Sequence, residues 1–285
     1  MIVSVFAAVL FAAALHAGWN AMLKGTAGDR LWTITMMCVA VTLVGAAATL
    51  FVPWPAAASW PYIVASGLLH VGYNLFLVRT YGSGDFSETY PIARGSSPML
   101  VAIGAAVFAG ERLDWLPALG IVLVCGGIIS LAHRGKGLPL GSLPPALATG
   151  AFIAAYSVVD GIGVRAAGDT LAYAAWMSVL WGGPMPVVFV LLRGGLRRGT
   201  AALLAGSAQR FAAAALGGWV SLIAYAIVIW AMHHGPMGPV SALRETGVLF
   251  AALLGRVALK EQLGVRRIAS CVVIACGAAC LGGAR

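Results

Sequence analysis

The chain has 285 residues, of which 61% are hydrophobic and only 9% are charged. Soluble domains carry about 25% charged residues, so this composition excludes an ordinary soluble domain. The formal net charge is +9, but the basic residues lie between apolar runs and form no basic stripe with interleaved aromatics, which argues against a nucleic-acid-binding protein. A membrane protein is the class that remains, in agreement with the mean hydropathy of +0.93.

Ten apolar runs are long enough to form membrane-spanning helices, because about 20 apolar residues cross the hydrocarbon core of a bilayer. Short connections separate the runs, and the alternating pattern of a membrane β-barrel is absent. We therefore predict an all-α polytopic membrane protein with ten transmembrane helices, at 2–23, 31–52, 60–80, 89–109, 115–133, 144–164, 170–192, 211–232, 238–258 and 266–283.

The positions of lysine and arginine predict the orientation of these spans. Arg94 and Arg244 lie inside predicted helices, and only Arg112, Arg165 and Arg285 fall on the side that holds both termini. All other lysines and arginines fall on the opposite side, and loops rich in these residues stay in the cytoplasm. We therefore predict a bacterial-type cytoplasmic (inner) membrane with both termini on the periplasmic side.

The two halves of the sequence repeat each other. "ARGSSPMLVAIGAAVFAGERL" aligns with "LRETGVLFAALLGRVALKEQL" at an offset of 150 residues, so that Arg94 matches Arg244 and Glu111 matches Glu261. Each half holds an odd number of spans, so the second must enter the membrane inverted. Inverted repeats with a substrate site between them form many secondary transporters. We predict a five-helix repeat at 1–135 and a second, inverted one at 136–285.

Three segments resemble a known family. They are "ALHAGWNAMLKG" in the first predicted helix, "GERLDWLPALGIVLVCGGIIS" at the end of the first half and "KEQLGVRRIASCVVIACGAACL" at the end of the second. They resemble the EamA branch of the drug/metabolite transporter superfamily, and the functional picture is similar to its YddG-like group of amino-acid exporters. The resemblance implies export of amino acids, other metabolites or toxic compounds.

Four ionisable residues fall inside predicted helices: Arg94, Asp160, Arg244 and Glu245. Each costs about 2.5–3.5 kcal/mol near the centre of a membrane helix, so we expect them to pair or to face a cavity. Adjacent helical residues diverge by about 100°, so Arg244 and Glu245 are not expected to pair with each other. Structural pairing or gating, substrate contact and proton coupling all remain open as roles for these residues.

The depths of these residues in the predicted topology indicate two clusters. We expect an outer cluster of Asp160, Arg244 and Glu245. We expect an inner cluster of Arg94 with Asn20 and Asn74.

Proline in the fourth predicted helix gives Arg94 a particular setting. Pro98 has no N–H, so the carbonyl of Arg94 loses its helical partner and the helix should bend. Ser96 and Ser97 can satisfy the freed backbone groups. The bend would turn the guanidinium toward the protein interior, where it could bind a carboxylate through two hydrogen bonds. The alternative is a kink that serves packing alone.

Aromatic and polar residues recur at helical spacing on two faces. His16, Trp19 and Asn20 share one stripe, and His70, Tyr73 and Asn74 share another. Each histidine alone is better explained by a satisfied interhelical hydrogen bond, whereas the stripes together favour a cavity wall. The candidate substrate-binding residues are His16, Trp19, Asn20, His70, Tyr73, Asn74, Tyr90, Arg94, Tyr156 and Tyr225. The candidate gating or coupling residues are Asp160, Arg244, Glu245 and Pro98.

These observations predict a secondary transporter that exports small metabolites by alternating access, with aromatic or other neutral amino acids as the first substrate class. The alternatives are a carrier of drug-like cations or other metabolites and a non-transporting membrane scaffold subunit. No nucleophile elbow, zinc-protease or phosphate-loop motif is present, so we expect no enzyme, no cofactor and no metal. The expected partners are the substrate, the lipid bilayer and protons, without nucleic acid, in a monomer or weak dimer.

Overall fold

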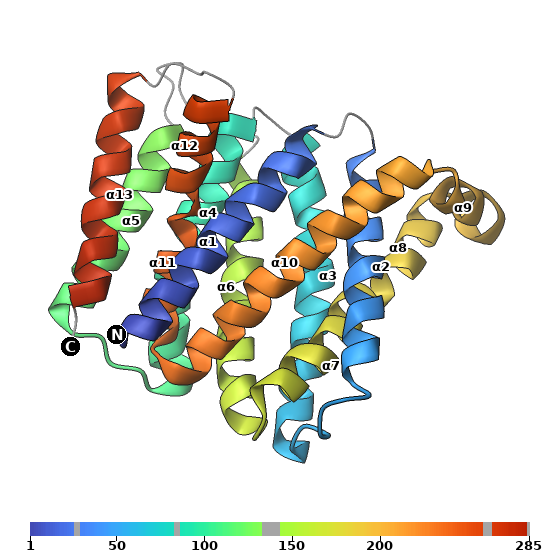
Figure 1. Cartoon of the computed structure of the whole chain (residues 1–285), viewed down its shortest axis with the longest axis horizontal. Helices are drawn as coiled ribbons and strands as arrows, with labels where there is room; N and C mark the ends of the chain where they lie inside the picture. Colours follow the sequence, from blue (N-terminus) through green and yellow to red (C-terminus); the bar gives the residue numbers. More distant parts are fainter. Residues whose placement is uncertain (26–28, 83–85, 133–142, 259–263, 284–285) are drawn as a thin grey trace.

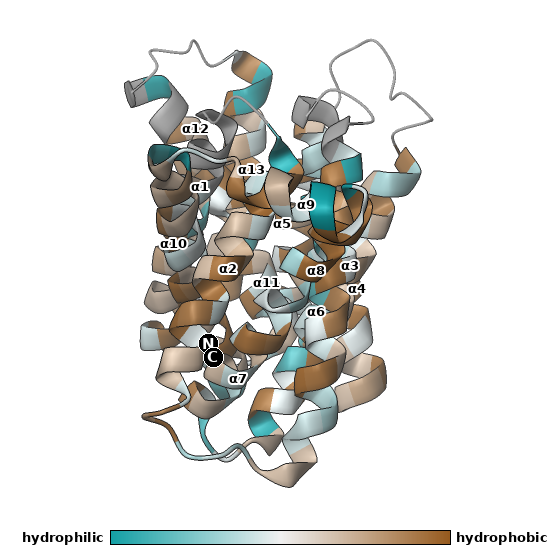
Figure 2. Cartoon of the chain, turned by 90° about the vertical axis from the view of Figure 1, so that its right-hand side faces the viewer, coloured by the Kyte–Doolittle hydropathy of each residue, from teal (hydrophilic) through white to brown (hydrophobic). Residues whose placement is uncertain are grey.

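A computed structural model describes residues 1–25, 29–82, 86–132, 143–258 and 264–283. Within these ranges the regular secondary structure is helical, without strands, which confirms the predicted all-α class. Eight candidate membrane spans are long and apolar enough to cross a bilayer. The chain is therefore a multi-pass membrane protein, in which hydrophobic residues recur along the helices (Figure 2) and many large hydrophobic side chains are exposed.

The helices stand side by side as a bundle in which α1 and α10 run obliquely (Figure 1). A short 3-10 turn, η1 (Ala57–Ser59), precedes α3. The helices are α1 (Val3–Gly25), α2 (Arg30–Ala48), α3 (Trp60–Gly82), α4 (Phe86–Ala109), α5 (Trp115–Ala132), α6 (Leu143–Ala166), α7 (Thr170–Gly182), α8 (Pro184–Leu192), α9 (Gly195–Leu204), α10 (Ala208–His234), α11 (Met237–Glu245), α12 (Gly247–Ala258) and α13 (Val265–Gly283).

The predicted ninth span is wrong as a single helix. It is divided into α11, which ends at Glu245, and α12, which begins at Gly247. At the break, the hydroxyl of Thr246 donates to a carbonyl of the preceding turn at 2.6 Å. A Cβ on Gly247 would lie 2.9 Å from the carbonyl oxygen of Ala13, so glycine lets the start of α12 approach α1. The interruption follows directly after two buried charged residues.

Two further features differ from the sequence prediction. The seventh predicted span, 170–192, coincides with a candidate span at Thr170–Leu192, but its helix is interrupted at Gly183, before Pro184, which has no N–H to continue the helical ladder. The sequence did not predict α9, which lies in the connection before α10 and near one end of the bundle (Figure 2).

Most of the extensive helix contacts join the two predicted repeats to each other. The helix α1 packs against α10, α11 and α12, and α3 packs against α6 and α7. The helix α2 packs against α7 and α10, α4 against α6 and α11, and α5 against α13. The core is therefore shared between residues from both halves of the chain.

The contact between α5 and α13 depends on small residues. A Cβ on Gly277 would lie 2.8 Å from the carbonyl oxygen of Gly120, and such glycines let membrane helices approach closely. In the same contact the hydroxyls of Ser130 and Ser270 form a hydrogen bond of 2.7 Å. The two helices lie along each other in Figure 1.

We expect Gly277→Ala to destabilise the protein, because its Cβ would meet backbone atoms that no side-chain movement can clear. Overpacking of this kind costs about 1–3 kcal/mol, and thermal unfolding in detergent would measure it. Gly126→Ala on α5 is the matched control, since a Cβ there meets nothing within 4 Å. Equal melting temperatures for the two variants would contradict the close α5–α13 contact.

Candidate functional site

All four ionisable residues that the sequence places inside helices are buried, with exposed fractions of 6% or less for Arg94, Asp160, Arg244 and Glu245. They do not form the two predicted clusters. Three of them meet at the end of α11, and Asp160 lies apart from them among tyrosines.

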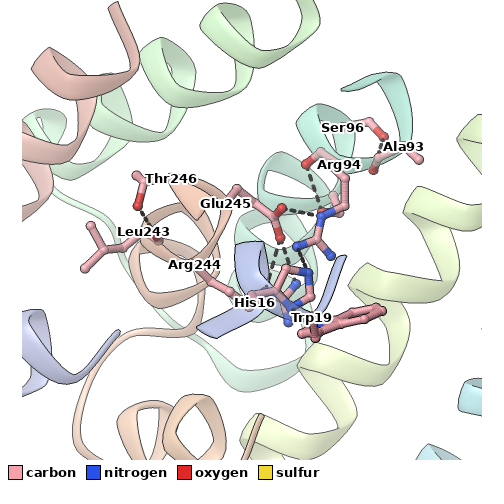
Figure 3. Close-up of polar contacts among 10 residues, drawn as sticks. His16, Trp19, Ala93, Arg94, Ser96, Leu243, Arg244, Glu245 and Thr246 are labelled. Atoms are coloured by element: carbon pink, nitrogen blue, oxygen red, sulfur yellow. Dashed lines mark hydrogen bonds and ion pairs between the residues drawn. The ribbon is translucent and has the colours of Figure 1, made fainter. Parts of the chain in front are cut away.

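Glu245 lies between two arginines (Figure 3). Its Oε2 lies 2.6 Å from Nε of Arg94 on α4, and its Oε1 accepts a hydrogen bond of 3.1 Å from Nε of Arg244. Arg94 and Arg244 are the two residues that the repeat alignment matches. Two arginines that the predicted repeat aligns, one from each half of the chain, therefore converge on one carboxylate, and we call these three residues the charge triad.

Two sequence-based expectations are wrong at the charge triad. Arg244 and Glu245 do pair, because the flexible arginine side chain turns back along a helix that stops one residue later. Arg94 is not grouped with Asn74, whose Nδ2 instead donates to Sγ of Cys38 at 3.6 Å. The side chain of Asn20, the other expected member of the inner cluster, lies outside the described residues.

Two residues of α1 extend the charge triad. Nη2 of Arg94 lies 2.5 Å from Nε2 of His16, and Nε1 of Trp19 donates to Nδ1 of His16 at 3.0 Å. The i, i+3 spacing of His16 and Trp19 thus brings them together beside Arg94 (Figure 3). Both ring nitrogens of the histidine face donor groups.

Asp160 binds tyrosines rather than arginine. Its Oδ1 accepts a hydrogen bond of 2.8 Å from Tyr173 on α7, and its Oδ2 accepts one of 2.5 Å from Tyr225 on α10. Among the ion pairs of the described residues none joins Asp160 to Arg244, so the expected outer cluster is wrong. The carboxyl instead links α6 to two neighbouring helices.

We expect these contacts to appear in double-mutant cycles on stability. Asp160→Asn and Tyr225→Phe should be non-additive by about 0.5–3 kcal/mol, as residues in direct contact are. Asp160→Asn and Arg244→Gln should be additive within about 0.5 kcal/mol. Thermal unfolding of the single and double variants measures both terms, and strong coupling of Asp160 to Arg244 alone would contradict the tyrosine contacts.

A cavity of about 60 Å³ lies beside the charge triad. A single water needs about 10–15 Å³, so the cavity has room for several. Predicted residues in its wall are His16, Trp19, His70, Tyr73, Asn74, Tyr156, Tyr225 and Arg244. Wall residues that the sequence did not single out include Met37, Cys38, Val41, Trp181, Ser221 and Val228.

Aromatic rings form one side of this cavity. His70 stacks on Tyr156 with ring centroids 4.0 Å apart, and Trp181 lies 4.8 Å from His70. Tyr225 meets Tyr156 edge to face at 5.7 Å. Nδ1 of His70 lies 2.9 Å from the carbonyl of Ser66, which can only accept, so this nitrogen carries the proton. The cavity therefore presents ring faces and edges to its contents.

Two buried atoms of the cavity wall are donors without a hydrogen-bonding partner among the described residues: Nε1 of Trp181 and Nη2 of Arg244. Nη2 of Arg244 lies 3.1 Å from Oε1 of Glu245, within ion-pair distance, but the geometry gives no hydrogen bond. Most buried polar atoms in proteins have a partner, so such atoms call for an explanation.

The remaining predicted residues lie near the charge triad on α4. The guanidinium of Arg94 lies 5.7 Å from the ring centroid of Tyr90. Pro98 stands inside α4, which is continuous past it. The hydroxyl of Ser97 donates to the carbonyl of Arg94 at 3.2 Å, which confirms that serine satisfies the group that the proline leaves free. Ser96 donates to a different carbonyl, that of Ala93.

A second ion pair holds the other end of α11. Nη2 of Arg165 donates to Oε1 of Glu111 at 2.6 Å, and Oε2 of Glu111 accepts from the backbone N–H of Met237 at 2.9 Å. Arg94 on α4 and Glu111, which lies just after the end of α4, thus bind the two ends of α11. The repeat equivalent of Glu111, Glu261, lies outside the described residues.

Tyr173 and Trp181 are the polar aromatic residues of the site that sequence reasoning missed. Both lie on α7, away from the charged positions that drew attention to the other spans. Buried tyrosine and tryptophan usually find a hydrogen-bonding partner. A polar aromatic residue inside an apolar span is therefore the signal that would have marked them.

The comparisons with known proteins support one class, a membrane transporter of small molecules. Residues 144–283 match the model of the EamA-like transporter family. A solved structure titled "Crystal structure of protein" matches with a TM-score of 0.71 and 21% sequence identity, over 97% of this chain and 94% of that chain. This likeness shows a shared fold. No curated protein matches the chain significantly.

Proposed function

We propose that the chain is a secondary transporter that moves small metabolites across the cytoplasmic membrane through the central cavity by alternating access. The observation that carries the proposal is the charge triad beside an aromatic cavity, buried within a helical membrane protein. Ionisable residues inside membranes are costly and mark substrate or ion pathways. The family match of residues 144–283 supports the same class.

The packing of the helices supports two inverted repeats, 1–135 and 136–285. In this correspondence α1 matches α6, α2 matches α7 together with α8, and α3 matches α10. The helix α4 matches α11 together with α12, and α5 matches α13. The contact of α3 with α6 then corresponds to that of α10 with α1, and the contact of α3 with α7 to that of α10 with α2. The pairs α2–α7, α4–α11 and α5–α13 correspond to themselves. An approximate two-fold relation through the cavity accounts for all of these contacts.

The arginines near α9 support the proposed orientation. Arg193 pairs with Asp29, and the guanidinium of Arg210 lies 4.8 Å from the ring centroid of Trp32. The helix α9 adds further arginines close by, and α1 begins and α13 ends at the opposite end of the bundle (Figure 1). By the positive-inside rule the α9 end is cytoplasmic, so both termini would be periplasmic in a bacterial-type membrane.

For the substrate we propose small metabolites with an apolar or aromatic part, with amino acids as the first class to test and export as the direction. This choice extends the sequence resemblance to YddG-like exporters. A scaffold subunit would need no polar cavity, so the cavity favours a carrier. Protons are the proposed coupling ion, with Asp160 as the candidate group because Tyr225 connects it to the cavity wall.

Flux into proteoliposomes tests this function. Purified protein would be reconstituted and assayed with labelled amino acids and aromatic acids, with and without a pH gradient. We expect saturable uptake that exchanges with unlabelled substrate. Arg198→Gln on α9 is a control that should keep the wild-type rate, because this side chain is exposed. Flux equal to that of protein-free liposomes for every compound would contradict the proposal.

A further inference from the structure

The charges beside the cavity do not balance. Arg94 and Arg244 face the single carboxylate of Glu245, so the charge triad carries one positive charge in excess. The other buried carboxyl among the described residues, Asp160, is not a residue of the cavity wall and binds two tyrosine hydroxyls. An unbalanced charge inside a membrane protein is costly, and an anion in the cavity would neutralise it.

The hydrogen-bonding groups of the site are unbalanced in the same direction. Nη2 of Arg244 and Nε1 of Trp181 are buried donors without an acceptor among the described residues. His16 faces donors at both ring nitrogens, those of Arg94 and Trp19. A neutral imidazole accepts through one nitrogen only, so it cannot satisfy both. Donors therefore outnumber acceptors around Arg244 and Trp181, and a carboxylate would supply the missing acceptor atoms.

The described lining of the cavity also lacks a negatively charged group that would hold an ammonium ion, since it contains no aspartate or glutamate. The nearby carboxylate of Glu245 already faces two guanidinium groups. Ring faces such as that of Tyr156 attract cations, but here the excess guanidinium charge of the triad opposes this attraction.

We infer that the cavity selects a small organic monoanion, with one carboxylate near Arg244 and Trp181 and a flat apolar body among the rings of His70, Tyr156 and Tyr225. The stacked and edge-to-face rings fit such a body. This inference rests on the proposed function and names the substrate class of the same site. Zwitterionic amino acids and cations are then the weaker ligands.

Three probes that share a phenylethyl group test the inference. They are 3-phenylpropionate, L-phenylalanine and 2-phenylethylamine, which carry a carboxylate, both charged groups and an ammonium group respectively. Binding to the full wild-type protein in detergent would be measured by calorimetry in a buffer free of carboxylates. We expect 3-phenylpropionate to bind at least tenfold more tightly than phenylalanine, and phenylethylamine not to compete.

Two variants separate the donors from general damage to the cavity. Arg244→Gln should weaken 3-phenylpropionate binding at least tenfold and remove its advantage over phenylalanine. Trp181→Phe keeps an aromatic ring but removes the N–H, and should weaken the carboxylate probe about threefold. This second variant keeps the test decisive if Arg244→Gln fails to fold. Arg198→Gln should bind all three probes as the wild type does.

Each contrary outcome has a distinct meaning. Equal or tighter binding of phenylalanine would overturn the inference, and its transport would still uphold the proposed function. Tighter binding of phenylethylamine would overturn the inference in favour of a cation carrier. If 3-phenylpropionate, benzoate and indole-3-acetate all fail to bind, the inference is also wrong, whereas saturable flux of another metabolite would leave the proposed function intact.

Discussion

Glu245→Gln is expected to be the most damaging substitution among the charged residues of the site. It removes the one carboxylate that lies between Arg94 and Arg244, so two buried guanidinium groups lose their counter-charge. Removing one partner of a buried ion pair costs about 3–5 kcal/mol. We expect a large fall in melting temperature or loss of the folded species, measured by thermal unfolding and size-exclusion chromatography in detergent.

Glu111→Gln provides the matched control for this prediction. Glu111 also pairs with an arginine, but the side chain of its partner Arg165 is 34% exposed, and exposed pairs contribute about 0–1 kcal/mol. The stability lost in Glu111→Gln should therefore be much smaller than that lost in Glu245→Gln. Adding Arg94→Gln to Glu245→Gln should recover part of the stability, because one unpaired charge is removed. A Glu245→Gln protein as stable as the wild type would show that the charge triad does not hold α4 against α11.

Arg94→Ala is expected to abolish most of the transport while the protein still folds. Without Arg94, Glu245 and Arg244 remain as a neutral pair at 3.1 Å, so no buried charge is left uncompensated. The excess positive charge beside the cavity is lost, together with the contact to His16. Hydrogen bonds to charged groups are worth about 1.5–3 kcal/mol, so the initial rate at low substrate concentration should fall about 10- to 100-fold.

Proteoliposome flux and thermal unfolding of the same preparations measure the two parts of this expectation separately. Arg94→Lys retains the charge but not the planar group that contacts both Glu245 and His16, so an intermediate rate is expected. Arg94→Ala that transports at the wild-type rate would remove Arg94 from the transport mechanism. A variant that fails to fold would instead assign Arg94 a structural role.

Part of the candidate site could be predicted from residue type alone. Arg94, Asp160, Arg244 and Glu245 stand out because charge is rare inside apolar runs, and the structure buries all four. The partners of these residues could not be predicted in this way. Depth in the membrane suggested that Asp160 would meet Arg244, but Tyr173 and Tyr225 reach Asp160 from neighbouring helices. Depth in the membrane specifies one coordinate of a side chain, whereas pairing between two side chains depends on all three coordinates of each.

The break between α11 and α12 shows the same limit at the level of the fold. Hydropathy predicts one span over 238–258, since both pieces are apolar and no proline stands between them. The helix nevertheless ends at Glu245, where its side chain pairs with Arg94 and where Gly247 lies against α1. These contacts come from helices more than a hundred residues away, and no local pattern contains them.

The sequence by itself determined that this is a helical membrane protein and identified most of the segments that are long and apolar enough to cross the bilayer. Backbone groups in lipid must be satisfied within each segment, so length and hydropathy suffice for that conclusion. Only the tertiary structure decided that arginines from both halves share one carboxylate, that a tyrosine pair binds Asp160, and that donors exceed acceptors at the cavity. Those features arise where side chains from helices that are distant in the sequence meet, and these meetings depend on how the helices pack in three dimensions.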